Sequence, residues 1–100
     1  MSDRKVTEQA AAHALLHLVE QGKGRSLNSK ACADFVLSWW SCRHHFAVGD
    51  IRKFRPEDLE AMRVLVNYIA ENPARWPDDV LPGKHIDRLL KCRQRIDKLN

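Results

Sequence analysis

Two tryptophans stand side by side in the stretch ADFVLSWW, residues 33–40, directly after an apolar run. Neighbouring residues on a helix point about 100° apart, so a single apolar face cannot hold both Trp39 and Trp40. Two apolar stripes, offset by one residue, run along residues 29–43: Cys32, Phe35, Val36 and Trp39 in one, and Ala33, Leu37 and Trp40 in the other. A helix that is apolar around this much of its circumference is packed on more than one side. We therefore expect a helix from about Ser29 to Arg43 at the centre of the fold, with the two tryptophans facing different neighbours.

Apolar residues recur at spacings of three and four in three further segments: about Asp3 to Gln21, Pro56 to Asn72, and Lys84 to Leu99. This period is typical of amphipathic helices. No segment shows the alternation of a half-buried strand. The sequence therefore predicts an all-α fold, a single domain covering residues 1–100 and built as a compact bundle of about four helices.

The connections between these helices are less regular. Residues 41–54 are expected to hold either a short extended piece or a single helical turn. Residues 71–83 contain three prolines and are expected to form a loop, with Trp76 tucked against the core. For the second helix, Asn28 or Ser29 is the expected cap.

The composition indicates a globular protein of the cytoplasm. No apolar run approaches the roughly 20 residues that span a bilayer, and the start MSDRKVTEQ has no apolar signal core, so export is not expected. Three cysteines, Cys32, Cys42 and Cys92, show no paired spacing and are expected to be reduced thiols, at least one of them filling the core.

Positive charge is concentrated near the C-terminus. The formal net charge is +4, and residues 84–98, with six cations and two acids, account for this excess. Five of the cations recur on one helical face: Lys84, Arg88, Lys91, Arg95 and Lys98. Two interpretations stay open. The face could contact phosphates or an acidic partner, or it could be a solvated surface whose long stems cover apolar neighbours. No helix-turn-helix, zinc-finger or RNA-recognition motif accompanies it.

Residue patterns that suggest metal binding are incomplete. His13 and His17 have the spacing of a zinc-binding helix, but the hydrolytic motif needs Glu where Ala14 stands. Cys42, His44 and His45 form a C-x-H-H stretch without a second ligand pair. We expect surface histidines in the first case and a helix end in the second, and neither a metal nor a cofactor.

No catalytic motif is present either. The sequence contains no Gly-rich phosphate loop, no G-x-S-x-G and no pair of carboxylates with catalytic spacing. Glu57, Asp58 and Glu60 fit the first turn of a helix, where acids complement the dipole. Asp78 and Asp79 fit a cap or a turn. We therefore expect no enzymatic activity and no catalytic residues.

Trp40 is the remaining candidate for a contact residue. Either another helix of the same chain buries it, or it belongs to an aromatic patch that a partner or a second copy covers. A homodimer that hides Trp40 is therefore a further alternative.

Four stretches, ADFVLSWW, the residues around FAVGDI, EAMRVLVNYI and WPDDVLPG, together resemble a family of small uncharacterised helical proteins encoded in proteobacteria, often on prophages and integrated mobile elements. The resemblance covers about residues 31–90. It departs from the family at residues 43–45, where small residues and glycine are expected, and in the basic C-terminal helix. The resemblance implies no catalytic residues. It implies a genomic setting in which small proteins often bind and block host machinery, and inhibitors of CRISPR surveillance complexes are one such class.

These observations lead to one leading hypothesis and one competitor. The leading hypothesis is a non-enzymatic helical protein that docks on a host protein or nucleoprotein complex, with contacts at Trp40, Arg43, His44, Arg88, Lys91 and Arg95. The competitor is an accessory protein that binds nucleic-acid phosphates without base specificity through the C-terminal helix. Neither hypothesis involves a membrane.

Overall fold

The computed structural model describes residues 6–41 and 43–99, and these residues form six helical elements and no strand. The elements are α1 (Glu8–Gln21), α2 (Leu27–Trp40), the 3₁₀ helix η1 (Val48–Lys53), α3 (Pro56–Glu71), α4 (Pro77–Val80) and α5 (Gly83–Leu99). The predicted all-α class is confirmed. Four long helices correspond to the four predicted segments. The total exceeds the predicted count of about four, because both irregular connections contain a short helix.

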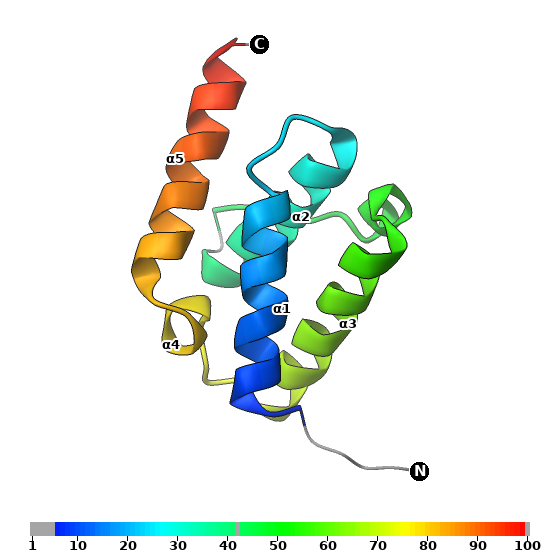
Figure 1. Cartoon of the computed structure of the whole chain (residues 1–100), viewed down its shortest axis with the longest axis vertical. Helices are drawn as coiled ribbons and strands as arrows, with labels where there is room; N and C mark the ends of the chain where they lie inside the picture. Colours follow the sequence, from blue (N-terminus) through cyan, green and yellow to red (C-terminus); the bar gives the residue numbers. More distant parts are fainter. Residues whose placement is uncertain (1–5, 42, 100) are drawn as a thin grey trace.

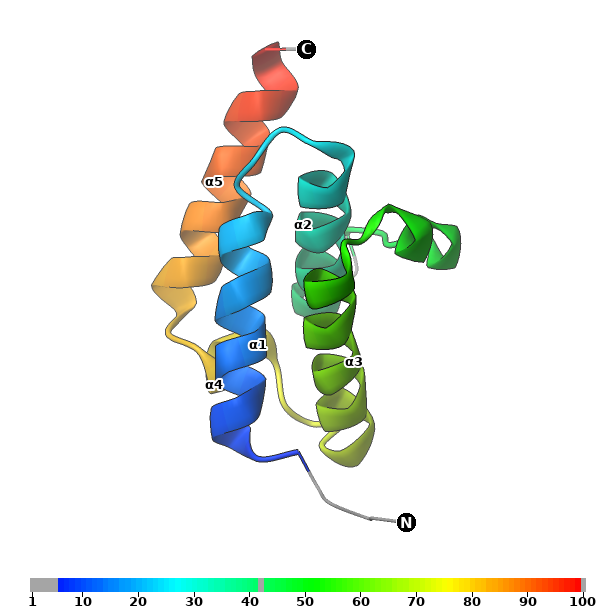
Figure 2. The same cartoon turned by 45° about the vertical axis from the view of Figure 1, so that its right-hand side comes forward.

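Helix α1 occupies the middle of the molecule, with α3 and α5 on either side of it and α2 behind (Figures 1 and 2). It contacts α2, α3, α4 and α5, and its packing on α3 is the most extensive in the fold. α2 contacts α1, η1, α4 and α5 but packs little on α3. The expectation that the helix of residues 29–43 is central therefore needs correction. α2 is heavily buried, as its two stripes predict, but α1 is the hub. Its small residues Ala11 and Ala14 let neighbouring helices approach closely, and Leu15 and Leu18 have no exposed surface.

Capping side chains decide where the first two helices begin. The hydroxyl of Thr7 accepts a hydrogen bond from Ala10 N at 3.0 Å, so α1 begins at Glu8, and the predicted start at Asp3 lies outside the described residues. Ser26 Oγ likewise accepts from Ser29 N at 3.0 Å, so α2 begins at Leu27 and its cap is neither of the two residues predicted.

The far end of α2 also differs from the prediction. The helix ends at Trp40, because Ser41 has extended backbone angles of φ −149° and ψ 135°. The predicted end at Arg43 is therefore wrong, and Cys42 lies outside the described residues. At the other helix ends the agreement is close: α3 stops at Glu71 with Asn72 as its cap, and α5 begins one residue before Lys84.

Of the two alternatives for residues 41–54, the helical turn is correct, in the form of η1. The flanking residues Phe46 and Phe54 hold this segment to the core. The ring of Phe46 meets Phe35 edge-on at 5.5 Å and Phe54 at 5.8 Å between centroids.

The Pro-rich connection contains α4, which the sequence pattern did not predict. Pro77 stands at its start, and the Asp79 carboxylate accepts a hydrogen bond from Trp76 N at 2.9 Å. Trp76 is 54% exposed, so the expectation that it is tucked against the core is wrong. Within the described chain, no helix has both the length and the apolar character needed to cross a membrane.

Candidate docking surfaces

Helix α5 separates its cations from its buried residues. Ile86 and Leu89 lie in the core, and Ile96 is buried further along the helix. All five cations of the predicted stripe are exposed: Lys84, Arg88, Lys91, Arg95 and Lys98, called the basic face from here on. Lys91 Nζ lies 3.1 Å from Asp87 Oδ2, and in the described part of the chain it is the basic face's one ion pair. The other four charges face solvent.

Hydrogen bonds from two neighbouring side chains, Arg93 and Cys92, fix the orientation of α5. Arg93, 7% exposed, donates from one guanidinium nitrogen to Gly24 O at 2.7 Å and to Gly22 O at 3.3 Å. The thiol of Cys92 donates to Lys23 O at 3.4 Å. These carbonyls follow the C-terminus of α1, where a cation complements the helix dipole. Arg93 therefore belongs to the interior, although its charge counts toward the basic segment.

Gly22 allows α5 and α2 to meet at the same place. A Cβ atom at this position would lie 3.0 Å from Leu89 Cδ1 and 3.1 Å from Ala33 Cα. Both distances are shorter than ordinary contacts between such atoms. Glycine at the end of α1 therefore avoids a tight contact that would make Leu89 or Ala33 shift.

The paired tryptophans face different neighbours, as predicted. The indole N–H of Trp39 donates to Arg75 O at 3.2 Å, which ties α2 to the segment before α4. The ring of Trp40 lies 6.1 Å from that of His44, tilted by 40°. Both tryptophans are half-buried and pack against the core. Of the two alternatives for Trp40, intramolecular packing therefore accounts for part of its surface, and part stays accessible.

The structure brings one of the three residues predicted at the end of α2 to α5. His44 is half-buried and lines a groove of about 110 Å³ between α2 and α5, together with Leu90 and Gln94. Arg43 is exposed and does not line this groove. Arg88, Lys91 and Arg95 share the exposed side of α5, and Gln94 lies between them and the groove on the helical wheel.

A hydrogen-bonded His–Asp pair between α1 and α3 was not predicted from the sequence. His17 Nε2 lies 2.6 Å from Oδ1 of Asp58, whose side chain has no exposed surface. Asp58 lies in the first turn of α3, as expected, but the burial of its side chain was not predicted. His17 is half-buried rather than a plain surface histidine, whereas His13 is exposed as expected. The spacing of Asp58 to Met62 and Leu65 could have revealed its burial, because it places Asp58 on the apolar face of α3.

Polar atoms gather around this pair. Asn28 Oδ1 accepts a hydrogen bond from Arg55 N at 2.9 Å. Among the described residues, Asn28 Nδ2 and Asp58 Oδ2 are buried without a protein partner. Burial, and next the negative charge of Asp58, raise the pKa of the Cys32 thiol to about 12, while Arg55 acts in the opposite direction. Cys32 is thus a protonated core thiol, in line with the expectation that at least one of the cysteines fills the core.

A shallow groove of about 690 Å³ lies between α1 and α3. Ala10, Ala14 and Ala61 contribute small apolar side chains to it, and His13, His17, Glu57 and Glu60 contribute polar ones. Within the ranges described, no set of three or more His, Cys, Asp or Glu side chains is arranged to hold a metal ion. The groove therefore offers volume, but the described residues around it form no metal site.

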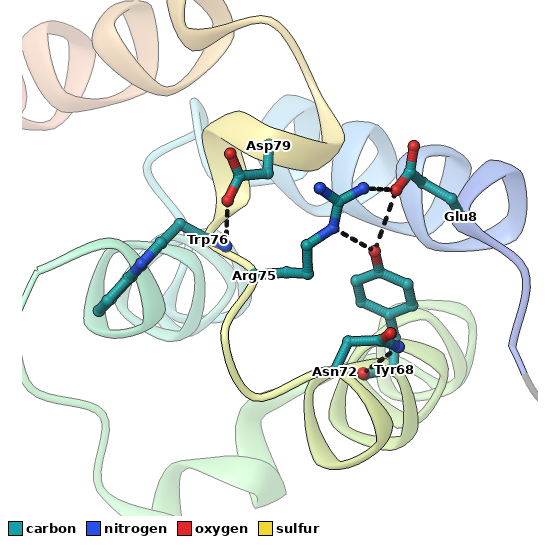
Figure 3. Close-up of polar contacts among 6 residues, drawn as sticks. All are labelled: Glu8, Tyr68, Asn72, Arg75, Trp76 and Asp79. Atoms are coloured by element: carbon teal, nitrogen blue, oxygen red, sulfur yellow. Dashed lines mark hydrogen bonds and ion pairs between the residues drawn. The ribbon is translucent and has the colours of Figure 1, made fainter.

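Around Arg75, a polar network joins the start of α1 to the end of α3 (Figure 3). The Tyr68 hydroxyl, on a side chain that is almost fully buried, donates to Glu8 Oε1 at 3.3 Å. Arg75 donates from Nε to the same hydroxyl at 3.3 Å and pairs with the Glu8 carboxylate through its guanidinium group. The network fixes the backbone immediately before Trp76.

Comparison with known proteins gives one match. The chain matches no curated protein and no solved structure. Residues 9–94 match the sequence model of the Family of unknown function (DUF7673). This match is wider than the resemblance over residues 31–90, because it also includes residues 9–30, with most of α1 and the start of α2, and residues 91–94 of α5. The chain therefore belongs to the Family of unknown function (DUF7673).

Proposed function

We propose that this protein is a non-enzymatic binding protein that docks on a larger protein or nucleoprotein complex through the basic face of α5. The observation that supports the proposal is the exposure of all five cations on the side opposite Ile86 and Leu89, with only Lys91 paired among the described residues. A row of unpaired charges complements an acidic surface, and it speeds the encounter with such a surface.

The end of α2 extends this surface. The groove that His44 lines borders the side of α5 next to the basic face, and Trp40 stacks near the imidazole. Arg43 is exposed in the same segment. Trp and Arg are the residue types most enriched at binding hot spots. The proposed interface thus combines cations on α5 with a partly accessible aromatic edge on α2.

One concrete form of the proposal is an inhibitor of a CRISPR surveillance complex, carried by a mobile element and acting in the cytoplasm. Support for this setting comes from the sequence resemblance to small mobile-element proteins. The basic face fits it, because a nucleoprotein target presents acidic groups.

The test compares two triple charge reversals in affinity capture from host cells. R88E/K91E/R95E alters the basic face, and R25E/R52E/R63E changes the net charge equally at exposed cations elsewhere. We expect the first variant to lose the partner that the wild type captures and the second to retain it. Equal capture by both variants would refute docking through α5. Unfolding curves of both variants verify that the fold is intact.

Direct binding to nucleic-acid phosphates is the second candidate function. It is favoured by the regular recurrence of the cations on successive turns of α5, roughly 5.4 Å apart along the axis. Titration with random duplex DNA at low and moderate salt distinguishes this function from docking on a protein complex. Tight binding that collapses with salt favours phosphate contact. If the protein does not bind the DNA even at low salt, the acidic surface of a partner protein remains the proposed target.

A further inference from the structure

Trp76 is the most exposed of the three tryptophans, since Trp39 and Trp40 are both half-buried. It lies directly before α4 and is 54% exposed. Large aromatic side chains contribute most when they are fully buried. Exposed tryptophans are also enriched at the centres of protein interfaces, where a partner completes their burial.

The backbone around Trp76 is held from both sides. On one side, Arg75 O accepts the indole N–H of Trp39 at 3.2 Å. On the other, Trp76 N donates to Asp79 Oδ2 at 2.9 Å, and Asp79 N donates to Trp76 O at 3.0 Å. The ring of Trp76 points away from the Arg75, Tyr68 and Glu8 cluster (Figure 3). A side chain presented from an ordered backbone loses less entropy when a partner binds.

Two carboxylates lie close to Trp76 in the chain. Residues 76–83, WPDDVLPG, carry Asp78 and Asp79 and no cation. Of the two flanking cations, Arg75 pairs with Glu8 and points away from the indole ring (Figure 3), and Lys84 is the first cation of the basic face. Both Asp78 and Asp79 are exposed. A tryptophan face attracts cations through its quadrupole, and neighbouring carboxylates reinforce that attraction.

We propose that Trp76, together with the carboxylates of α4, is a docking point for an arginine or lysine side chain on a basic segment of a partner protein. The cation lies over the indole face, its apolar stem covers the ring edge, and Asp78 supplies the counter-charge. This surface adjoins the basic face at Lys84, but it binds a group of the opposite charge, so it stands or falls independently of the proposed function.

The experiment follows the three indole N–H signals of the ¹⁵N-labelled protein by NMR, with the Trp76 signal assigned by its loss in Trp76→Phe. Octa-arginine is the probe, and octa-glutamate and an uncharged Gly/Ser octapeptide are the controls. We expect a saturable shift of the Trp76 signal with octa-arginine alone. Binding by the variants is followed through the backbone amide signal of Asp79, which every variant retains. Trp76→Leu should weaken binding about tenfold and Asp78→Asn about threefold. Val48→Ala, at another exposed apolar residue, should bind as the wild type does.

Trp76→Leu separates a cation site from a plain apolar patch, because leucine keeps apolar area and lacks the π face. Wild-type affinity in this variant would overturn the proposal. An unchanged Trp76 signal with octa-arginine, or an equal shift with octa-glutamate, would overturn it as well. Self-association that Trp76→Leu abolishes would instead make a second copy the occupant. Thermal unfolding controls for the fold of each variant.

Discussion

The imidazole of His17 on α1 reaches across to Asp58 on α3, with 2.6 Å between Nε2 and Oδ1. The carboxylate has no exposed surface, while the side chain of His17 is 33% exposed. The pair joins the two helices with the most extensive mutual packing in the fold. Because the Asp58 carboxylate is buried and has a single protein partner, removing His17 and removing Asp58 should not cost the same stability.

Removing His17 should therefore cost more stability than neutralising Asp58. His17→Ala leaves a buried carboxylate without its partner, and we expect a loss of about 3 kcal/mol in the free energy of unfolding. Asp58→Asn removes the charge itself and should cost about 1–2 kcal/mol. Urea denaturation measures both, with His13→Ala as the exposed control. The reverse order of the two losses would contradict this account of the pair.

Arg93 should matter for stability and Arg88 should not. Arg93→Met deletes two hydrogen bonds to the carbonyls of Gly22 and Gly24, and charge-assisted bonds of this kind contribute about 2 kcal/mol together. Arg88→Met changes an exposed cation and should stay within about 0.5 kcal/mol of the wild type. Similar unfolding midpoints for the two variants would mean that Arg93 does not anchor α5.

Gly22 and Gly49 form a matched pair of glycine substitutions. Gly22→Ala forces a Cβ against Leu89 and the backbone of Ala33, which should cost about 1–3 kcal/mol. Gly49→Ala meets no atom within 4 Å, so it should be neutral or slightly stabilising. Thermal unfolding of both variants makes the comparison. A neutral Gly22→Ala would show that α2 and α5 can separate at this point without cost.

Cys32 should make stability fall at alkaline pH. Its thiol pKa rises from 9.0 to about 12 in the folded protein, mainly through burial. Above pH 9.0 the unfolded chain releases this proton while the folded chain retains it. Stability should therefore decline as pH rises from that point, by up to about 1.4 kcal/mol per pH unit. Below that pH the thiol contributes no slope.

The contribution of Cys32 is isolated by comparing urea denaturation of the wild type and Cys32→Ala across the alkaline range. Other groups titrate there in both proteins, so the difference in slope belongs to this thiol. A difference of zero would mean that the thiol ionises equally in the folded and unfolded states.

Local sequence determined which segments became helices, because helical period, proline and glycine act over a few residues. The boundaries at Glu8 and Leu27 depended on which hydroxyl captured a backbone N–H, so Thr7 and Ser26 moved them from their expected places. α4 was missed because its four residues are too short to show a period, although Asp79, whose carboxylate accepts from Trp76 N, was among the residues expected to cap or turn the chain.

The all-α class, the exposure of the basic face and the different neighbours of Trp39 and Trp40 were readable from the sequence, since each follows from positions on one helix. The hub role of α1, the burial of Asp58 against His17, the anchoring of Arg93 and the exposure of Trp76 were decided only by the tertiary structure. Each depends on contacts between residues far apart in the chain. A helical pattern predicts which face of a helix is apolar, but it does not predict which other segment will cover that face.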